Sequence, residues 1–216
     1  MESRTLSAED LLHGAMYAME QAGFLLHDAV GLFTQGRYAS AVVLAVFSRE
    51  ELGRARIYLE NRKRALATGP VPEDTVTDQC DDHVEKLHRG QIGVTLEWGP
   101  EHRERFKGLF MHPQSPESKE AHALVHELAK IKARRNPQDT HDKRLKALYV
   151  EPDEIGTGWN RPCEMPREEC RRLIQDVANS YGVFSGNLMV ADEELAAAIA
   201  QWSGCPRLPD PIHPDL

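Results

Sequence analysis

One stretch of the sequence decides the fold: Ala41-Val42-Val43-Leu44-Ala45-Val46-Phe47-Ser48-Arg49-Glu50-Glu51-Leu52-Gly53-Arg54-Ala55. From Ala41 to Phe47 it is apolar on every side of a helix, and a helix of that kind is buried. It belongs to a long helix that we expect over residues 38–66, because Gly69-Pro70 is a strong stop signal. The stretch therefore predicts a helix at the centre of the molecule.

A second long helix is predicted just before it. Ser7, with Asp10 three residues later, forms a start that resembles a capping box, and apolar residues then recur at three- and four-residue steps as far as Phe33. Thr34-Gln35-Gly36 ends this helix. Because only a short loop joins the two long helices, we expect them to pack antiparallel as a helical hairpin.

The rest of the chain also has mostly helical patterns. Further helices are expected over residues 78–88, from Ser115 onward, from Pro137 to Tyr149 and from about Pro166 to Trp202. Alternation typical of strands is nearly absent, and residues 150–165 are predicted to be an extended excursion. We therefore predict an all-α bundle that forms one domain over residues 1–204. A proline-rich tail, residues 205–216, is expected to be extended or disordered.

Composition is that of an ordinary globular protein. The 216 residues are 41% hydrophobic and 28% charged, which is enough for a sizeable buried core. The net charge is -8 and the sequence pI is about 5.7, so the overall charge does not indicate a nucleic-acid binder. A local basic patch can still bind an anion, because at physiological salt a surface charge acts over only about 8 Å. Acidic residues elsewhere on the protein therefore do not cancel it.

The sequence contains no pattern of an exported, membrane or metal-binding protein. No two of the four cysteines form a C-x-x-C pair, and the longest apolar run, residues 41–47, is far too short to span a membrane. His122 and His126 lie one helical turn apart but lack the glutamate of an H-E-x-x-H motif. We expect a cytoplasmic protein without a membrane segment, a metal site or a cofactor. Its cysteines are expected to be reduced thiols, with a structural disulfide as the alternative.

A carboxylate on a packing face is the first chemical anomaly. At 100° per residue, Glu51 shares a helix face with Leu44 and Phe47. A carboxylate in that position is costly unless it is paired. Two interpretations stay open: an ion pair with an arginine of a facing helix, or a carboxylate that lines a groove.

The second anomaly is the stretch from Arg135 to His141. Arg135 falls seven residues after Leu128, so it continues that helix's inward stripe. His141 lies four residues before Leu145 and seven before Leu148, which places it on the inward stripe of the next helix. The two stripes meet at one joint, since asparagine followed by proline breaks the helix between them.

Basic side chains surround this joint: Lys130, Lys132, Arg134, Arg135, Lys143, Arg144 and Lys146. Arginine can bind phosphate oxygens through two parallel hydrogen bonds, and histidine can move protons near neutral pH. The joint therefore suits a phosphodiester. The alternative is a capping histidine beside a solvated basic face.

These residues resemble a known superfamily. An arginine and a polar residue followed by a histidine four to six positions on is the HEPN signature, and Arg135-Asn136 with His141 matches it. The stretch that ends at Ala55 is similar to the Ser-x-Glu-Glu-Leu-Gly-Lys-Ala segment of the AbiV-type abortive-infection branch. Asp82–Leu87 resembles that branch's His-x-x-Lys-Leu segment, and Leu145–Glu151 resembles its Leu-Tyr-Val-Asp segment. Together these segments cover roughly residues 7–200.

The resemblance implies a HEPN-like bundle with a phage-defence role. In the wider superfamily the chemistry is metal-independent cleavage of RNA in a groove shared by a homodimer, in which the ribose 2′-hydroxyl attacks the adjacent phosphate. Carried over by position, His141 would be the acid/base, Arg135 would stabilise the charge of the phosphorane, and Asn136 would orient the pair.

Other residues would support such a site. Glu51 would hold Arg135 or a neighbour, and the groove would also contain Arg54, Lys143 and Arg144. The alternative function is a non-catalytic module that binds a phage protein or a host translation protein through its helical surface. Whether the chain is an enzyme depends on which of these two holds.

Overall fold

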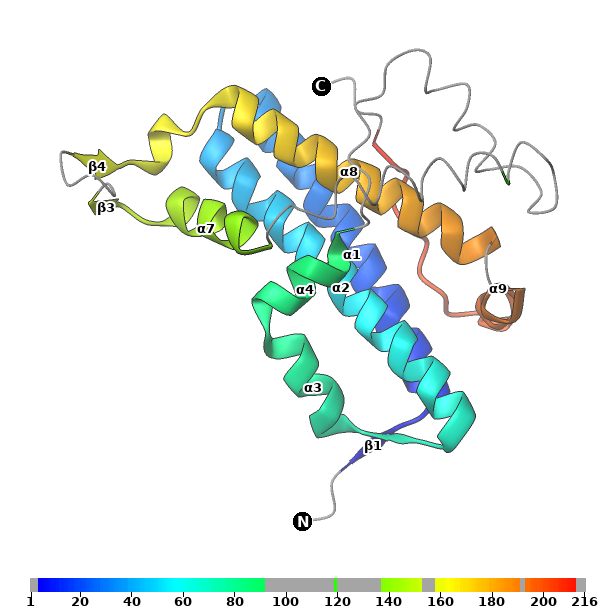
Figure 1. Cartoon of the computed structure of the whole chain (residues 1–216). Helices are drawn as coiled ribbons and strands as arrows, with labels where there is room; N and C mark the ends of the chain where they lie inside the picture. The colour runs from blue at the N-terminus through cyan, green and yellow to red at the C-terminus, as the bar shows by residue number, and fades with distance from the viewer. Residues whose placement is uncertain (1–3, 92–118, 120–136, 153–157, 191–192, 213–216) are drawn as a thin grey trace.

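Two long helices run through the computed structural model (Figure 1). The structure describes residues 4–91, 119, 137–152, 158–190 and 193–212. Helices α1 (Ala8–Thr34) and α2 (Tyr38–Thr68) form the predicted antiparallel hairpin. Over the described ranges every other element is a shorter helix or a two-residue strand, so the all-α prediction is confirmed.

Five further helices and two small strand pairs complete the described part. The helices are α3 (Glu73–Asp81), α4 (His83–Gly90), α7 (Pro137–Leu148), α8 (Arg167–Val190) and α9 (Glu193–Gln201), with a 3-10 turn at Pro162–Glu164. The antiparallel strand pairs are β1 (Thr5–Leu6) with β2 (Val71–Pro72), and β3 (Glu151–Pro152) with β4 (Trp159–Asn160). In Figure 1 the β3–β4 arm extends to one side of the bundle.

The ends of the hairpin follow the sequence signals. The Ser7 hydroxyl accepts a hydrogen bond from the Asp10 backbone N–H at 3.1 Å, and the Asp10 carboxylate accepts one from the Ser7 N–H at 2.9 Å. This is the predicted capping box, which satisfies amide donors that the first helical turn leaves without partners. Gly36 turns the chain between α1 and α2 at a φ of 75°, a conformation that glycine adopts without a steric cost.

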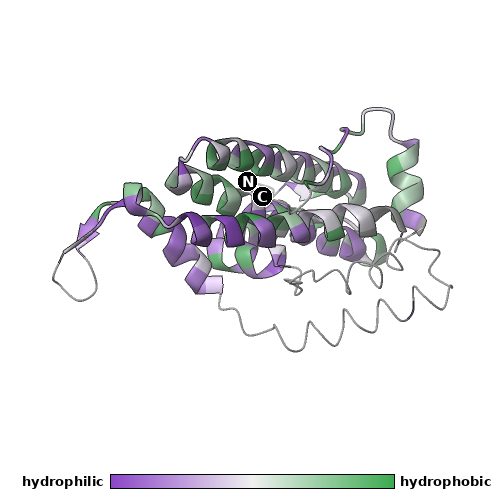
Figure 2. Ribbon diagram, turned by 90° about the horizontal axis from the view of Figure 1, so that it is seen from above, coloured by the Kyte–Doolittle hydropathy of each residue, from purple (hydrophilic) through white to green (hydrophobic). Residues whose placement is uncertain are grey.

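Helix α2 is the central element, because α1, α4, α7 and α8 all pack against it. The main core lies between α1, α2 and α8, and its fully buried side chains include Met19, Leu26, Val42, Val46, Ile174 and Tyr181. Hydrophobic and hydrophilic residues alternate along the helices in Figure 2, as amphipathic packing requires. The predicted burial of the apolar stretch in α2 is therefore confirmed.

Helices α2 and α4 touch through their backbones. A Cβ added at Gly53 would lie 1.9 Å from the carbonyl oxygen of Lys86, and one added at Gly90 would lie 2.1 Å from the carbonyl oxygen of Arg49. Any side chain at either position would push the helices apart. The two glycines thus bring α4 against the turn of α2 that carries Arg49 and Glu50.

Two predicted helices are each divided in two. The helix expected over residues 78–88 is interrupted at Asp82, whose carboxylate accepts hydrogen bonds from the backbone of Val84 at 2.9 Å and Glu85 at 3.0 Å and caps α4. Instead of the single helix expected from residue 166 to 202, the chain forms two helices, α8 and α9. Helix α9 turns back on the bundle, which buries Leu195 and Ile199 against the core.

The C-terminal tail is bound to the bundle over residues 205–212. The Tyr181 hydroxyl donates to the carbonyl of Pro209 at 2.8 Å, and His27 Nε2 lies 3.0 Å from the carbonyl oxygen of Asp210. Pro209 also packs against Gly23. These contacts hold residues 205–212 against α1 and α8, while the division into a domain over residues 1–204 and a tail stays a prediction.

The helix predicted from Pro137 is confirmed as α7, but its inward face differs. Leu148 is 42% exposed, and the buried residues of the helix are Arg144 and Ala147. The physical reason is that α7 packs on α2 through the ion pair of Arg144 with Glu50, and on α4 through the 3.4 Å contact of Arg144 with His83. The helix expected from Ser115 lies outside the described residues.

The described residues include all four cysteines, the two long helices and most of the acidic side chains. All four cysteines are free thiols. No helix in the described ranges combines the length and the hydropathy needed to cross a bilayer. Within the same ranges, no three histidine, cysteine, aspartate or glutamate side chains gather closely enough to hold a metal ion.

Candidate functional site

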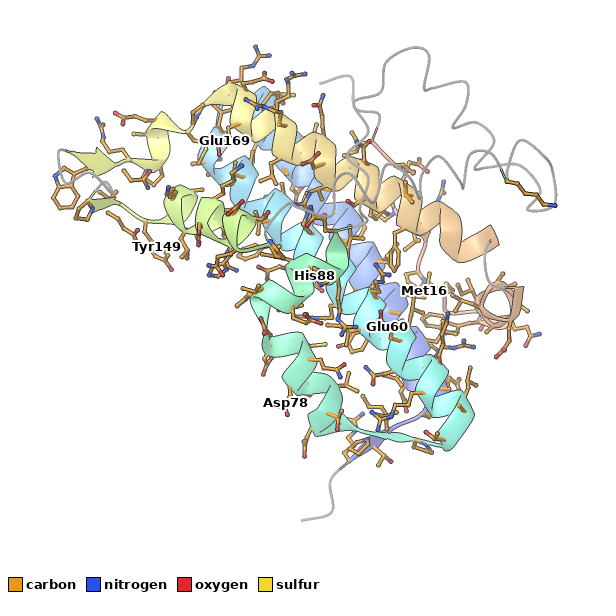
Figure 3. The ribbon with its side chains drawn as sticks, viewed as in Figure 1. Met16, Glu60, Asp78, His88, Tyr149 and Glu169 are labelled. Atoms are coloured by element: carbon orange, nitrogen blue, oxygen red, sulfur yellow. The ribbon has the colours of Figure 1, made fainter. Side chains whose placement is uncertain are left out.

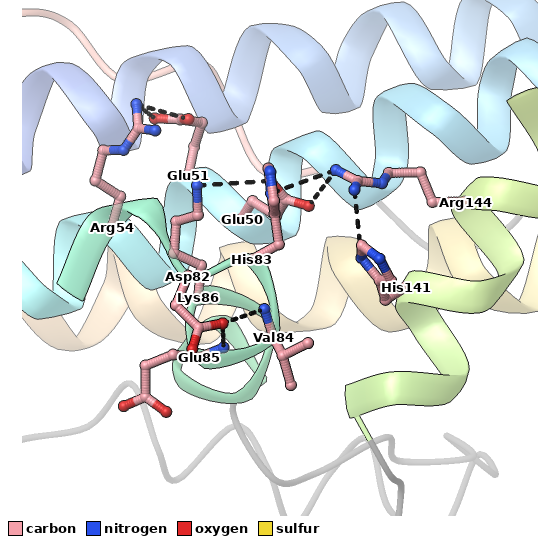
Figure 4. A network of polar contacts seen from close by, with 10 residues as sticks. All are labelled: Glu50, Glu51, Arg54, Asp82, His83, Val84, Glu85, Lys86, His141 and Arg144. Atoms are coloured by element: carbon pink, nitrogen blue, oxygen red, sulfur yellow. Dashed lines mark hydrogen bonds and ion pairs between the residues drawn. The ribbon is translucent and has the colours of Figure 1, made fainter. Parts of the chain in front are cut away.

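Glu50 lies at the centre of a buried charged cluster between α2, α4 and α7 (Figure 4). One carboxylate oxygen accepts from an Arg144 guanidinium nitrogen at 2.9 Å. The other lies 2.8 Å from His83 Nδ1 and 3.8 Å from Lys86 Nζ. We call Glu50, His83, Lys86, Arg144 and His141 the Glu50 cluster.

His141 joins the cluster through Arg144. Its Nδ1 lies 3.3 Å from the second terminal nitrogen of the Arg144 guanidinium. The rings of His83 and His141 have centroids 6.1 Å apart. The side chain of His83 is 47% exposed and His141 is half-buried, so both imidazoles lie at the solvent edge of a buried ion cluster.

Local sequence spacing explains how the cluster forms. Arg144 follows His141 by three residues, so one turn of α7 presents both side chains on the same side. His83 and Lys86 have the same spacing on α4. Glu50 precedes Gly53 by three residues on α2, so the backbone contact at Gly53 brings α4 directly onto the carboxylate.

The cluster carries more buried positive than negative charge. Glu50, Lys86 and Arg144 are each less than a tenth exposed, so one carboxylate is matched by two cations. Buried charges are tolerated when they are paired and hydrogen-bonded. The Arg144 Nε is also buried and finds no hydrogen-bond acceptor among the described residues. This arrangement favours an anion next to the two histidines.

Glu51, the carboxylate singled out by the sequence, is not part of this cluster. It pairs at 3.0 Å with Arg54, one turn further along its own helix (Figure 4). Among the described residues, the arginine that pairs with Glu51 lies on its own helix, and it is Glu50 that pairs with an arginine of a facing helix. Burial raises the pKa of the Glu51 carboxyl, and the neighbouring Arg54 opposes that shift.

Lys143 and Arg144 point to different neighbours although they are adjacent in sequence. Lys143 Nζ lies 3.3 Å from the carboxylate of Glu169, which is near the start of α8 (Figure 3). Lys143 and Glu169 line a cleft of about 310 Å³ between α2, α7 and α8. In this cleft Arg49 approaches the Thr140 hydroxyl at 3.5 Å. Lys143 thus borders this cleft, while Arg144 belongs to the buried cluster.

The structure adds groups that the sequence did not single out as site residues, above all Glu50 and His83. A usable signal existed for Glu50, because Val43, Val46, Glu50, Gly53 and Ile57 follow one another at alternating three- and four-residue steps. All five are buried, so this is the inward face of α2. The predicted Arg135 and Asn136 lie outside the described residues.

Comparisons with known proteins point to one family. A model of HEPN domains described as AbiV matches residues 10–181 of the chain. The matched region contains α2, α4 and α7, and hence every residue of the Glu50 cluster. No curated protein and no solved structure matches the chain.

Proposed function

Because the chain belongs to the AbiV family of HEPN domains, we propose that it is a phage-defence effector that cleaves RNA without a metal ion. The observation that carries the proposal is the position of Arg144. Its guanidinium is held by the Glu50 carboxylate and reaches His141 at 3.3 Å. A fixed cation beside a partly exposed imidazole can stabilise charge on a phosphate and transfer protons, the two tasks of RNA cleavage without a metal ion.

The proposed reaction is an internal transesterification. The ribose 2′-hydroxyl loses its proton and its oxygen bonds to the adjacent phosphorus, while the bond from phosphorus to the 5′-oxygen breaks. The 5′-oxygen gains a proton, which leaves a 2′,3′-cyclic phosphate and a 5′-hydroxyl. The proton transfer needs a histidine, which by family position is His141, and Arg144 stabilises the charge on the phosphate oxygens. By family position, Arg135 adds a second cation and Asn136 orients the pair.

Incubation of the purified protein with RNA in EDTA tests this proposal directly. We expect fragments with 2′,3′-cyclic phosphate and 5′-hydroxyl ends, and no cleavage of the same sequence with 2′-O-methyl riboses. His141→Ala should lower the rate about 10²–10⁴-fold, because it removes a side chain that either exchanges a proton with the substrate or donates a hydrogen bond to its phosphate. Intact RNA after incubation with folded wild-type protein would refute the nuclease proposal.

We also propose that the active form is a homodimer, as the resemblance to HEPN domains implies. Two copies related by a two-fold axis would bring two His141 sites to one groove. Light scattering at tens of micromolar should give twice the mass of the chain. A monomer at that concentration would refute a shared groove.

One observation favours the alternative of a non-catalytic binding module. Tyr149 and Val150, at the end of α7, and Trp159, on the β3–β4 arm, are 53%, 62% and 63% exposed. Exposed aromatic and apolar side chains that lie close together are typical of protein-binding surfaces. Under this alternative, Trp159→Ser abolishes phage protection while His141→Ala leaves it intact. The nuclease proposal expects the reverse.

A further inference from the structure

We infer that His83, rather than His141, removes the 2′-hydroxyl proton. This inference rests on the proposed RNA cleavage and divides the work between the two imidazoles of the Glu50 cluster. The family signature contains only one histidine, and the structure adds the second from α4, in the same chain. The argument depends on which ring nitrogen of each histidine carries a proton.

His141 holds its ring proton on Nε2. A guanidinium has hydrogen-bond donors and no acceptor, so Nδ1 of His141, at 3.3 Å from Arg144, must be the accepting nitrogen. The proton of the neutral ring then lies on Nε2. In that state Nε2 can donate a hydrogen bond but has no lone pair to accept a proton. His141 is therefore arranged to bind an oxygen anion.

His83 has the opposite arrangement. Its Nδ1 lies 2.8 Å from a Glu50 carboxylate oxygen, which can only accept. An Arg144 nitrogen is also 3.4 Å from this Nδ1, but the same nitrogen donates to Glu50 at the shorter distance of 2.9 Å. The carboxylate contact therefore decides the tautomer. Nδ1 carries the proton and Nε2 keeps a free lone pair, as in histidine bases that a carboxylate orients.

The surroundings of His83 fit this role. Within the part of the chain that the structure describes, the charged and titratable groups that face it are Glu50 from α2, Arg144 and His141 from α7, and Lys86 from its own helix. The buried carboxylate fixes the ring, while almost half of the side chain remains accessible to a substrate. The ring centroids are 6.1 Å apart, a separation at which one phosphate group can accept hydrogen bonds from both rings.

The resulting step is balanced. His83 Nε2 takes the proton of the 2′-hydroxyl as the 2′-oxygen bonds to phosphorus. His141 Nε2–H and Arg144 donate hydrogen bonds to the non-bridging phosphate oxygens. The bond to the 5′-oxygen breaks, and that oxygen takes a proton from water. The proton on His83 returns to the resulting hydroxide, so that no net water or proton is consumed.

Glutamine substitutions separate the two roles, because glutamine keeps an N–H donor but cannot act as a base near neutral pH. His83→Gln should lower kcat at least 100-fold and abolish the rise of kcat/KM with pH that deprotonation of the base produces. His141→Gln should retain at least ten times the activity of His141→Ala, since it still donates to the phosphate. His88→Gln, an exposed histidine further along α4, is the matched control and should match the wild type (Figure 3).

The outcomes distinguish this inference from the function on which it rests. If wild-type protein does not cut RNA, the proposed function fails and the assignment of His83 fails with it. If wild-type protein cuts RNA and His83→Gln keeps both its rate and its pH profile, only the assignment is overturned. Equal losses in His141→Gln and His141→Ala, with an active His83→Gln, would return the base to His141. Thermal melts of all variants verify that each is folded.

Discussion

Glu50→Ala should be among the most destabilising single substitutions in this protein. Glu50, Lys86 and Arg144 are 4%, 3% and 8% exposed, so removal of the carboxylate leaves two buried cations without their shared anion. Breaking a buried ion pair in this way costs about 3–5 kcal/mol. For a chain of this size, about 2–4 °C of melting temperature corresponds to each kcal/mol, so we expect a decrease of roughly 6–20 °C.

The neighbouring residue provides the control. Glu51 pairs with Arg54 on the same helix, and the Arg54 side chain is 35% exposed, so Glu51→Ala leaves a cation that water still reaches. Glu51→Ala should therefore lower the melting temperature by less than Glu50→Ala does. Circular dichroism during heating, repeated as urea unfolding, measures both variants. A wild-type melting temperature for Glu50→Ala, or a larger loss for Glu51→Ala, would refute the assignment of the buried carboxylate.

Removal of a cation as well should restore part of the loss. The double variant Glu50→Ala/Arg144→Met removes the carboxylate and one of its two buried cations, so that only the Lys86 ammonium stays buried. Replacement of a buried pair by apolar side chains is often close to neutral in stability. The double variant should therefore be more stable than Glu50→Ala alone. Strict additivity of the two single losses would contradict a direct interaction.

Four further predictions concern the scaffold. Gly53→Ala places a methyl group 1.9 Å from a backbone oxygen of α4 and should cost at least about 1–3 kcal/mol in urea unfolding. Burial raises the pKa of the Cys170 thiol to about 12, so at pH 8 a disulfide reagent should label exposed Cys163 rapidly and Cys170 only on unfolding. The folded protein keeps the Cys170 proton to higher pH than the unfolded chain does. The free energy of unfolding should therefore be unaffected by this thiol below about pH 8.5, and should decrease as the pH rises from there towards 12. Ser7→Ala removes the cap of α1 and should cost about 1 kcal/mol in the same unfolding experiment, an effect that Asp10→Ala should largely reproduce.

The hairpin could be predicted from the sequence because its signals are local. The capping box at Ser7, the turn at Gly36 and the stop at Gly69 each act within a few residues of the chain. Apolar spacing within α1 then determines which side of that helix is buried. None of these features depends on a partner that is distant in the sequence.

The buried carboxylate could not be identified in the same way. Residues 41–47 are apolar on every side, so they do not define which face of α2 meets α4 and α7. The face that contains Leu44 and Phe47 therefore points to Glu51. The decision between Glu50 and Glu51 depends on Arg144, which lies 94 residues further along the chain. Only the tertiary structure brings the two together.

His83 remained without a chemical role for a related reason. In the sequence it is one polar residue at the start of a short helix, and half of its side chain is exposed in the structure. Its chemical identity as a base comes from the carboxylate of Glu50, 33 residues earlier in the chain. The resemblance of Asp82–Leu87 to a family segment includes His83, but it does not indicate that Glu50 is its partner.

The backbone contact between α2 and α4 has a consequence for how members of this family can diverge. Neither Gly53 nor Gly90 can gain even one carbon atom without separating the two helices. Separation would also remove the Glu50 carboxylate from the His83 ring. The glycines and this dyad should therefore be inherited together, and a natural relative with larger residues at both glycine positions should also have lost the histidine, the glutamate or both.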